Sequence, residues 1–119
     1  MKKLMIVDDA AFMRVSIKRM LGDQDYEIVA EAEDGEQAVE LYKKYKPDVI
    51  TMDITMPKMT GIEALKAIKA IDKNVKVVML SAMGQEFLIR ESVMNGAESF
   101  VVKPFNKEKL VEVLNKVTG

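Results

Sequence analysis

Short runs of apolar residues alternate along the chain with longer segments in which apolar residues recur every three or four positions. The runs are typical of strands buried on both faces of a sheet, and the recurring pattern is typical of helices with one buried face. The runs predict five strands, at residues 4–7, 26–32, 49–52, 75–80 and 100–102. The recurring pattern predicts five helices, at residues 11–21, 35–45, 61–71, 85–95 and 107–117.

Residues with capping chemistry support these boundaries. Asp34 and Asn106 are predicted to cap the starts of the second and fifth helices, because their side chains accept hydrogen bonds from the first free N–H groups of a helix. Gly22 and the pair Asn95-Gly96 are predicted to end the first and fourth helices. On the first helix, Phe12 is expected to belong to the apolar face.

The alternation predicts an α/β fold, a doubly wound five-stranded parallel sheet with helices on both faces. Right-handed crossovers and the element count favour the flavodoxin-like strand order 2-1-3-4-5, which is taken from that known architecture. A single domain spanning residues 1–119 is expected. No apolar run approaches the roughly 20 residues of a membrane span, and the apolar run after Met-Lys-Lys is too short for a signal peptide, so a cytoplasmic protein is expected.

The composition then excludes most catalytic chemistry. The chain has no cysteine, which excludes disulfides, thiolate nucleophiles and zinc fingers, and no histidine, which excludes an imidazole base. The net charge of -1 argues against nonspecific binding of nucleic acid. The remaining functional groups are carboxylates, amines and hydroxyls, which suit hard cations such as Mg²⁺.

Polar residues with chemistry to offer stand directly after four of the five apolar runs. Asp8 and Asp9 follow the first run, Asp53 the third, Ser81 the fourth and Lys103 the fifth. Because sites in open parallel sheets lie beyond the carboxyl ends of the strands, we expect these five side chains to lie close together. Three carboxylates repel one another unless a cation joins them, and a Mg²⁺ site made of oxygen ligands satisfies that need. A metal, an ammonium and a hydroxyl around one carboxylate suit phosphoryl transfer, with the carboxylate itself as acceptor.

At these positions the sequence resembles the receiver domain of two-component response regulators. The resemblance covers the whole chain and rests on four ordered segments: Val7-Asp8-Asp9, Asp53 with Met56-Pro57 and Gly61, Ser81-Ala82, and Lys103-Pro104-Phe105. It implies a signalling switch that is not an enzyme in the usual sense, although it catalyses its own phosphorylation and slow dephosphorylation.

The resemblance also implies a role for each residue. Asp53 is the implied phosphoacceptor, Ser81 and Lys103 are implied to contact the phosphoryl oxygens, and the Lys103–Pro104 peptide is implied to be cis. In the family, phosphorylation draws the hydroxyl at the position of Ser81 toward the phosphoryl group and turns an aromatic residue of the fifth strand, here Phe100, inward. The implied ligands of Mg²⁺ are Asp8, Asp9, Asp53 and the backbone carbonyl of Thr55.

Three segments narrow the resemblance to stand-alone chemotaxis regulators of the family: residues 9–14, 53–57 and 81–85. No output domain is expected, so the output is expected to come from docking of a monomer that binds neither nucleic acid nor membrane. The implied partners are a histidine kinase of the chemotaxis type, the flagellar motor switch protein and a dedicated phosphatase. Met83, two residues beyond Ser81, is apolar and cannot orient an attacking water, so we expect it to slow self-hydrolysis.

Three alternatives compete with this interpretation. A single-domain phosphorelay intermediate, which passes its phosphoryl group to another histidine, is poorly separated by sequence. A phosphatase of the haloacid-dehalogenase type needs an acid two residues after its nucleophile, where Thr55 stands after Asp53. A flavodoxin-like FMN carrier needs a phosphate-binding loop after the first strand, where Asp8 and Asp9 would repel the phosphate.

Overall fold

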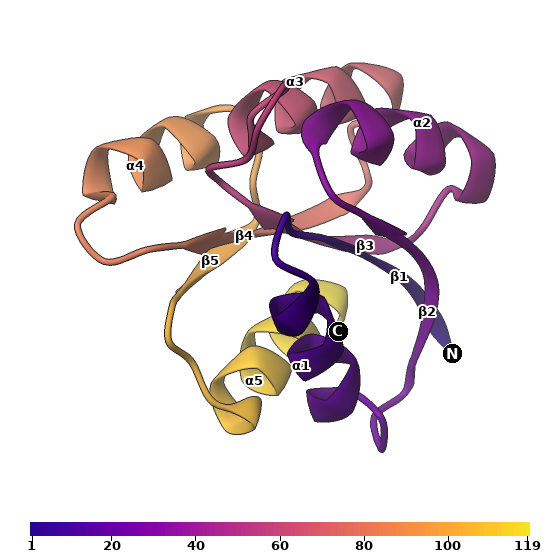
Figure 1. Cartoon of the computed structure of the whole chain (residues 1–119). Coiled ribbons are helices and arrows are strands. Elements are labelled where there is room, and N and C mark those ends of the chain that lie inside the picture. The colour runs from indigo at the N-terminus through magenta and orange to yellow at the C-terminus, as the bar shows by residue number, and fades with distance from the viewer.

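The computed structural model describes all 119 residues and contains one five-stranded sheet between two layers of helices (Figure 1). Every neighbouring pair of strands is parallel, and the order is β2-β1-β3-β4-β5. This arrangement confirms the predicted fold class and strand order. The strands are β1 (Lys2–Val7), β2 (Tyr26–Ala32), β3 (Val49–Asp53), β4 (Lys76–Ser81) and β5 (Ser99–Val102).

The helices divide between the two faces of the sheet. Figure 1 shows α1 and α5 together on one face and α2, α3 and α4 on the other. No helix of the structure has the length and apolarity needed to cross a membrane. The helices are α1 (Ala11–Met20), α2 (Gly35–Tyr45), α3 (Gly61–Ile71), α4 (Glu86–Met94) and α5 (Lys107–Thr118).

The central strands supply side chains alternately to two hydrophobic clusters. In β1, Met5 and Val7 join the cluster with α2 and α3, whereas Leu4 and Ile6 join the cluster with α1 and α5. All four side chains are completely buried. Because successive side chains of a strand point to opposite faces, a strand covered on both faces needs an unbroken apolar run. The apolar run at residues 4–7 therefore reflects the burial of β1 on both faces.

Most of the predicted helix ends are confirmed. The side chain of Asp34 accepts a hydrogen bond from the Gln37 N–H at 2.9 Å, and the side chain of Asn106 accepts one from the Lys109 N–H at 2.8 Å. α4 ends at Met94, and Gly96 adopts a left-handed conformation with φ of +103°. These residues predict helix ends correctly because capping satisfies backbone groups that the helix leaves free.

Two expectations for α1 are wrong. Leu21, not Gly22, caps the helix, and its N–H reaches the Ile17 carbonyl without a left-handed residue. Leu21 is buried, so packing of an apolar side chain decides where the helix ends. Phe12 is 74% exposed, because α1 presents Ile17 and its neighbour Met13 to the core, and Phe12 lies about 100° away from Met13 around the helix.

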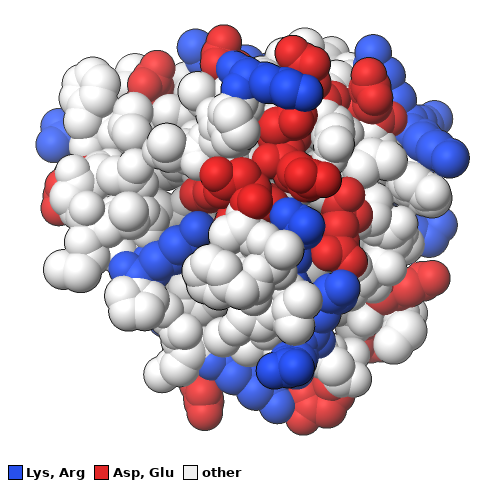
Figure 2. All heavy atoms as spheres, viewed as in Figure 1, with Lys and Arg blue, Asp and Glu red and all other residues white.

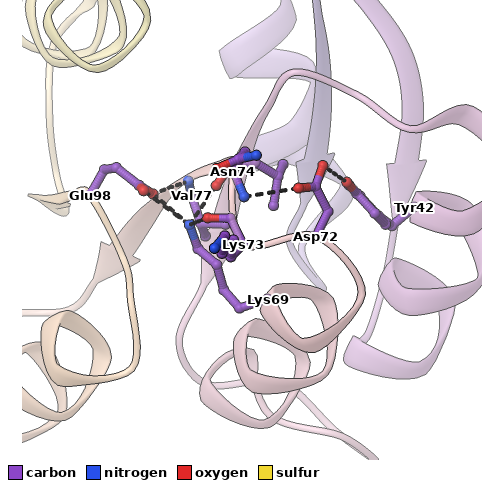
Figure 3. A network of polar contacts seen from close by, with 8 residues as sticks. Tyr42, Lys69, Asp72, Lys73, Asn74, Val77 and Glu98 are labelled. Atoms are coloured by element: carbon purple, nitrogen blue, oxygen red, sulfur yellow. Dashed lines mark hydrogen bonds and ion pairs between the residues drawn. The ribbon is translucent and has the colours of Figure 1, made fainter.

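A polar network closes the edge of the sheet at which the strands begin (Figure 3). Glu98 donates its N–H to the Val77 carbonyl at 2.9 Å, and its carboxylate accepts the Val77 N–H at 2.8 Å. The Lys69 ammonium holds the same carboxylate at 2.9 Å. Beside it, the Tyr42 hydroxyl donates to Asp72 at 2.9 Å. These paired groups join α2, α3 and the starts of β4 and β5.

Replacing Glu98 with alanine should lower the free energy of unfolding by about 1–3 kcal/mol, because it removes the acceptor of the Val77 N–H and the only carboxylate paired with the largely buried Lys69 ammonium. Urea denaturation measures this change. The matched control is Glu112→Ala, which breaks an exposed pair with Lys109 and should cost less than about 1 kcal/mol. Equal losses in the two variants would contradict a structural role for the network.

Candidate functional site

The ends of β1 and β3 bring two aspartates to the same level of the sheet. Val7 pairs with Met52, so the residues that follow them, Asp8 and Asp53, lie side by side. Asp9 comes next in the loop toward α1. Figure 2 shows acidic side chains gathered in the middle of this face, at the place where Figure 1 shows the end of β1 above α1. The structure thus brings together the three aspartates that the sequence predicted.

Carboxylate oxygens of Asp8, Asp9 and Asp53 lie within 4.8 Å of one another. Asp8 is completely buried and Asp53 is 8% exposed, whereas Asp9 is exposed. Mg²⁺ holds oxygen ligands at about 2.1 Å in an octahedron, so opposite ligands are about 4.2 Å apart. The separations of at most 4.8 Å are close to that spacing, and the donor set consists only of the hard oxygen atoms that Mg²⁺ prefers. The three residues therefore fit this metal.

Asp8 is held from three sides. Its carboxylate accepts the Ala10 N–H at 2.9 Å and the Lys103 ammonium at 2.9 Å. Its backbone carbonyl accepts Nη1 of Arg14 at 2.6 Å, and Arg14 is itself fixed by Glu31 of β2 at 3.3 Å. Hydrogen bonds from charged donors are stronger than those between neutral groups, so the loop after β1 is well defined. Asp8 is thereby kept buried and correctly oriented.

Lys103 brings positive charge to the cluster. It follows β5, and its N–H donates to the Ser81 carbonyl at 2.7 Å, which fixes its place beside the end of β4. Its Nζ lies 2.9 Å from the Asp8 carboxylate and 3.5 Å from the Asp53 carboxylate. Burial acts to lower the pKa of Lys103, but the hydrogen bond to Asp8 and the charges of Asp53 and Asp8 outweigh it and raise that pKa. The ammonium is therefore firmly charged.

The surroundings of Asp53 disfavour its ionised form. Burial, and next the negative charge of Asp8, raise the pKa of Asp53 to about 6, while the Lys103 charge opposes the rise. The start of α3 packs so closely against Asp53 that a Cβ on Gly61 would lie 1.9 Å from the Asp53 carbonyl oxygen. Only glycine permits that approach. A buried, partly neutralised carboxylate beside an ammonium is well placed to receive a cation or an electrophile.

The remaining predicted residues differ in how deeply they are buried. Ser81 is completely buried, and its hydroxyl has no hydrogen-bond partner, so it is free to donate. Thr55 lies in the exposed loop after β3. Phe100 is 40% exposed on β5, between a hollow against α4 and another against α5. The Lys103–Pro104 peptide is cis, as the resemblance implied.

Sequence reasoning missed two residues that organise the site, Arg14 and Gln85. Arg14 ends the segment at residues 9–14 and Gln85 ends the segment at residues 81–85, and neither pattern indicates a role for its last residue. The Gln85 side chain accepts the Ala82 N–H at 2.7 Å and donates to the Thr55 hydroxyl at 3.0 Å. Gln85 and Thr55 lie 30 residues apart in the sequence, and no spacing or periodicity predicts their contact.

Replacing Asp53 with asparagine should stabilise the metal-free protein at neutral pH. A carboxyl with a higher pKa in the folded chain binds its proton more tightly there, so stability is lost as pH rises from about 4 through about 6. Asp53→Asn should therefore raise the free energy of unfolding by about 1–2 kcal/mol at pH 7.5, with a smaller gain at pH 4.5.

Urea denaturation in EDTA at both pH values measures this gain. Asp23→Asn is the matched control and should show none, because the hydrogen bond from Lys107 lowers the pKa of Asp23. A loss of stability in Asp53→Asn at pH 7.5 would show that the carboxylate is not strained.

Comparisons with known proteins agree with this geometry. A model of the response regulator receiver domain matches residues 4–115. The chain is 51% identical over 117 residues to chemotaxis protein CheY of Thermotoga maritima, with 98% of each chain covered. It is 53% identical over 114 residues to CheY of Bacillus subtilis, covering 96% of this chain and 95% of the relative. Its fold matches CheY in the CheX–CheY–BeF3–Mg complex of Borrelia burgdorferi with a TM-score of 0.94 at 38% identity, covering 99% of this chain and 90% of the other.

Receiver domains of this type are signalling proteins rather than classical enzymes, and they pair with histidine kinases and other partners. They generally use Mg²⁺ at an aspartate pocket, and the cluster of Asp8, Asp9 and Asp53 is an acidic pocket of that kind. The family match, the relatives and the strand order all agree, and the chain belongs to the response regulator receiver domains.

Proposed function

We propose that this chain is a phosphorylation-activated switch that accepts a phosphoryl group on Asp53 from the phosphohistidine of a sensor kinase. One observation carries the proposal. The buried Asp53 carboxylate has Asp8 and Asp9 within 4.8 Å, the Lys103 ammonium 3.5 Å away, and the free hydroxyl of Ser81 at the end of the neighbouring strand. A phosphorylatable acceptor needs this combination of nucleophile, metal ligands and hydrogen-bond donors.

In the proposed reaction, a carboxylate oxygen of Asp53 forms a bond to phosphorus while the P–N bond of the phosphohistidine breaks. The electron pair of that bond stays on the imidazole nitrogen, which then takes a proton from solvent. The three aspartates and the Thr55 backbone carbonyl would hold Mg²⁺, which would neutralise charge at the phosphoryl oxygens. Lys103 contacts one phosphoryl oxygen, and the Ser81 hydroxyl donates to another.

The absence of histidine from the chain fits this division of labour. The chain has carboxylates that can accept a phosphoryl group and no imidazole that could donate one. The phosphohistidine therefore belongs to another protein, which we propose is a kinase of the chemotaxis type. A cytoplasmic location is part of this proposal, because such a kinase needs access to ATP.

The output of the switch is a change in the face formed by α4, β5 and α5. Large apolar side chains are exposed there, including Phe87 at 76%, Met94 at 86% and Phe100 at 40%. When the Ser81 hydroxyl moves toward the phosphoryl group, the Phe100 ring turns inward and remodels this face. We propose the flagellar motor switch as the partner that docks on it. The CheX–CheY complex among the related structures supports a dedicated phosphatase as a second partner.

Incubation with Mg²⁺ and acetyl phosphate should add one phosphoryl group to the protein, and Asp53→Asn should abolish the addition. Intact-protein mass spectrometry measures it, and EDTA should prevent it because the pocket then lacks its cation. The matched control is Asp25→Asn, since Asp25 is exposed and lies far from the pocket. If Asp53→Asn is labelled as fully as the parent, another residue is the acceptor.

Replacing Met83 with asparagine should shorten the lifetime of the phosphorylated protein several-fold. Met83 is 78% exposed two residues beyond Ser81, and an amide there can orient a water toward the phosphoryl group where a thioether cannot. The decay of the phosphorylated mass after removal of acetyl phosphate measures the lifetime. Met94→Asn is the control, because Met94 is equally exposed but lies at the end of α4. An unchanged decay in Met83→Asn would refute this role.

A further inference from the structure

One side chain links the two loops that border the pocket. The Oε1 atom of Gln85 accepts the Ala82 N–H at 2.7 Å, and its Nε2 donates to the Thr55 hydroxyl at 3.0 Å. Ala82 follows Ser81 at the end of β4, and Thr55 lies two residues beyond Asp53 at the end of β3. The amide of Gln85 therefore spans the opening between these two strand ends.

The Ala82 N–H points to the side of β4 on which Asp53 lies. In a strand, the backbone groups of successive residues point alternately to the two neighbouring strands. The Leu80 carbonyl accepts the Ile54 N–H on the side of β3, and the Ser81 carbonyl accepts the Lys103 N–H on the side of β5. The Ala82 N–H must then point back toward β3, where Asp53 ends the strand. Gln85 therefore holds a backbone donor on the side of β4 that borders the Asp53 pocket.

Gln85 also begins α4. It is the N-cap residue of that helix, and its backbone carbonyl accepts the Ile89 N–H at 2.9 Å. Its side chain makes no capping bond to the helix and is committed to the loops instead. Ser92 is the one fully buried residue of α4, and Leu88 and Ile89 pack against the core while only partly buried, so few contacts hold the helix. A change at the Gln85 side chain can therefore move the first turn of α4.

We propose that Gln85 is a positioning residue that restrains the unphosphorylated pocket and couples it to α4. Its amide oxygen holds the Ala82 N–H, a phosphoryl group on Asp53 takes that donor, and the freed Gln85 releases the first turn of α4. The exchange is favourable because a charged phosphoryl oxygen is a stronger acceptor than a neutral amide. The inference deepens the proposed function and rests on it.

The test uses fluoroberyllate with Mg²⁺ as a non-covalent probe of the phosphoryl position, and isothermal titration calorimetry gives its dissociation constant. Gln85→Met removes both hydrogen bonds at similar side-chain size and should tighten binding about two- to tenfold, the equivalent of one ordinary hydrogen bond. Gln85→Ala should act in the same direction. Gln85→Glu keeps an acceptor for the Ala82 N–H and makes it ionised, so it should bind the probe more weakly than the parent.

The neighbouring residue Glu86 provides the control for charge. Glu86 is exposed, so Glu86→Gln measures the effect of one nearby carboxylate without the bridge. The weakening in Gln85→Glu should exceed that charge effect. If Gln85 had a merely structural role, all its variants would change the dissociation constant of fluoroberyllate in the same direction. A restraint by Gln85 predicts a lower dissociation constant for Gln85→Met and a higher one for Gln85→Glu.

Amide spectra supply the second readout. In the parent, fluoroberyllate should shift the amide resonances of Ala82 and of residues 86–89. In Gln85→Met the Ala82 shift should remain and the shifts in α4 should shrink, because the connection is gone. If the parent binds the probe but Gln85→Met binds it no more tightly, the proposed restraint by Gln85 is wrong and the proposed function still stands. If the parent does not bind the probe at all, both are wrong.

Discussion

Three carboxylates at one edge of the sheet repel one another, and the Lys103 ammonium is the one positive group that touches two of them. It lies 2.9 Å from Asp8 and 3.5 Å from Asp53. Asp8 is completely buried, and an unpaired buried charge is costly, so this contact is a condition for the folded state. The neutralisation is incomplete, because one ammonium faces three acids. Burial, and next the remaining repulsion from Asp8, raise the pKa of Asp53 and leave the pocket receptive to a divalent cation.

The fold tolerates this repulsion because its stability comes from elsewhere. Two hydrophobic clusters flank the sheet and draw on β1, β3 and β4, whose side chains are buried on both faces. At the opposite edge, Lys69 and Glu98 satisfy each other and the backbone of Val77. The sheet therefore has one edge where charges are paired and one where they are in conflict.

The placement of the aspartates was predictable because parallel strands enforce it. A buried strand reads as an apolar run, and the first polar residue after the run must emerge at the carboxyl edge. Asp8, Asp53 and Ser81 follow this rule, and Lys103 obeys it one residue after β5. Phe12 broke the corresponding rule for helices. A helix with few buried positions has a narrow apolar stripe, and an aromatic residue beside that stripe resembles one within it.

Side-chain bridges between loops obey no such periodicity. Arg14 reaches the Asp8 carbonyl, and Gln85 reaches Thr55, through side-chain conformations that depend on where each loop finally lies. Strand ends are positioned by the sheet, whereas the loops that follow are positioned partly by these bridges. The residues that do the chemistry therefore stand at predictable places. The loop residue proposed to couple the pocket to α4, in contrast, is found only from the folded structure. A switch built on this fold can keep its pocket and change its coupling by substitutions in the loops alone.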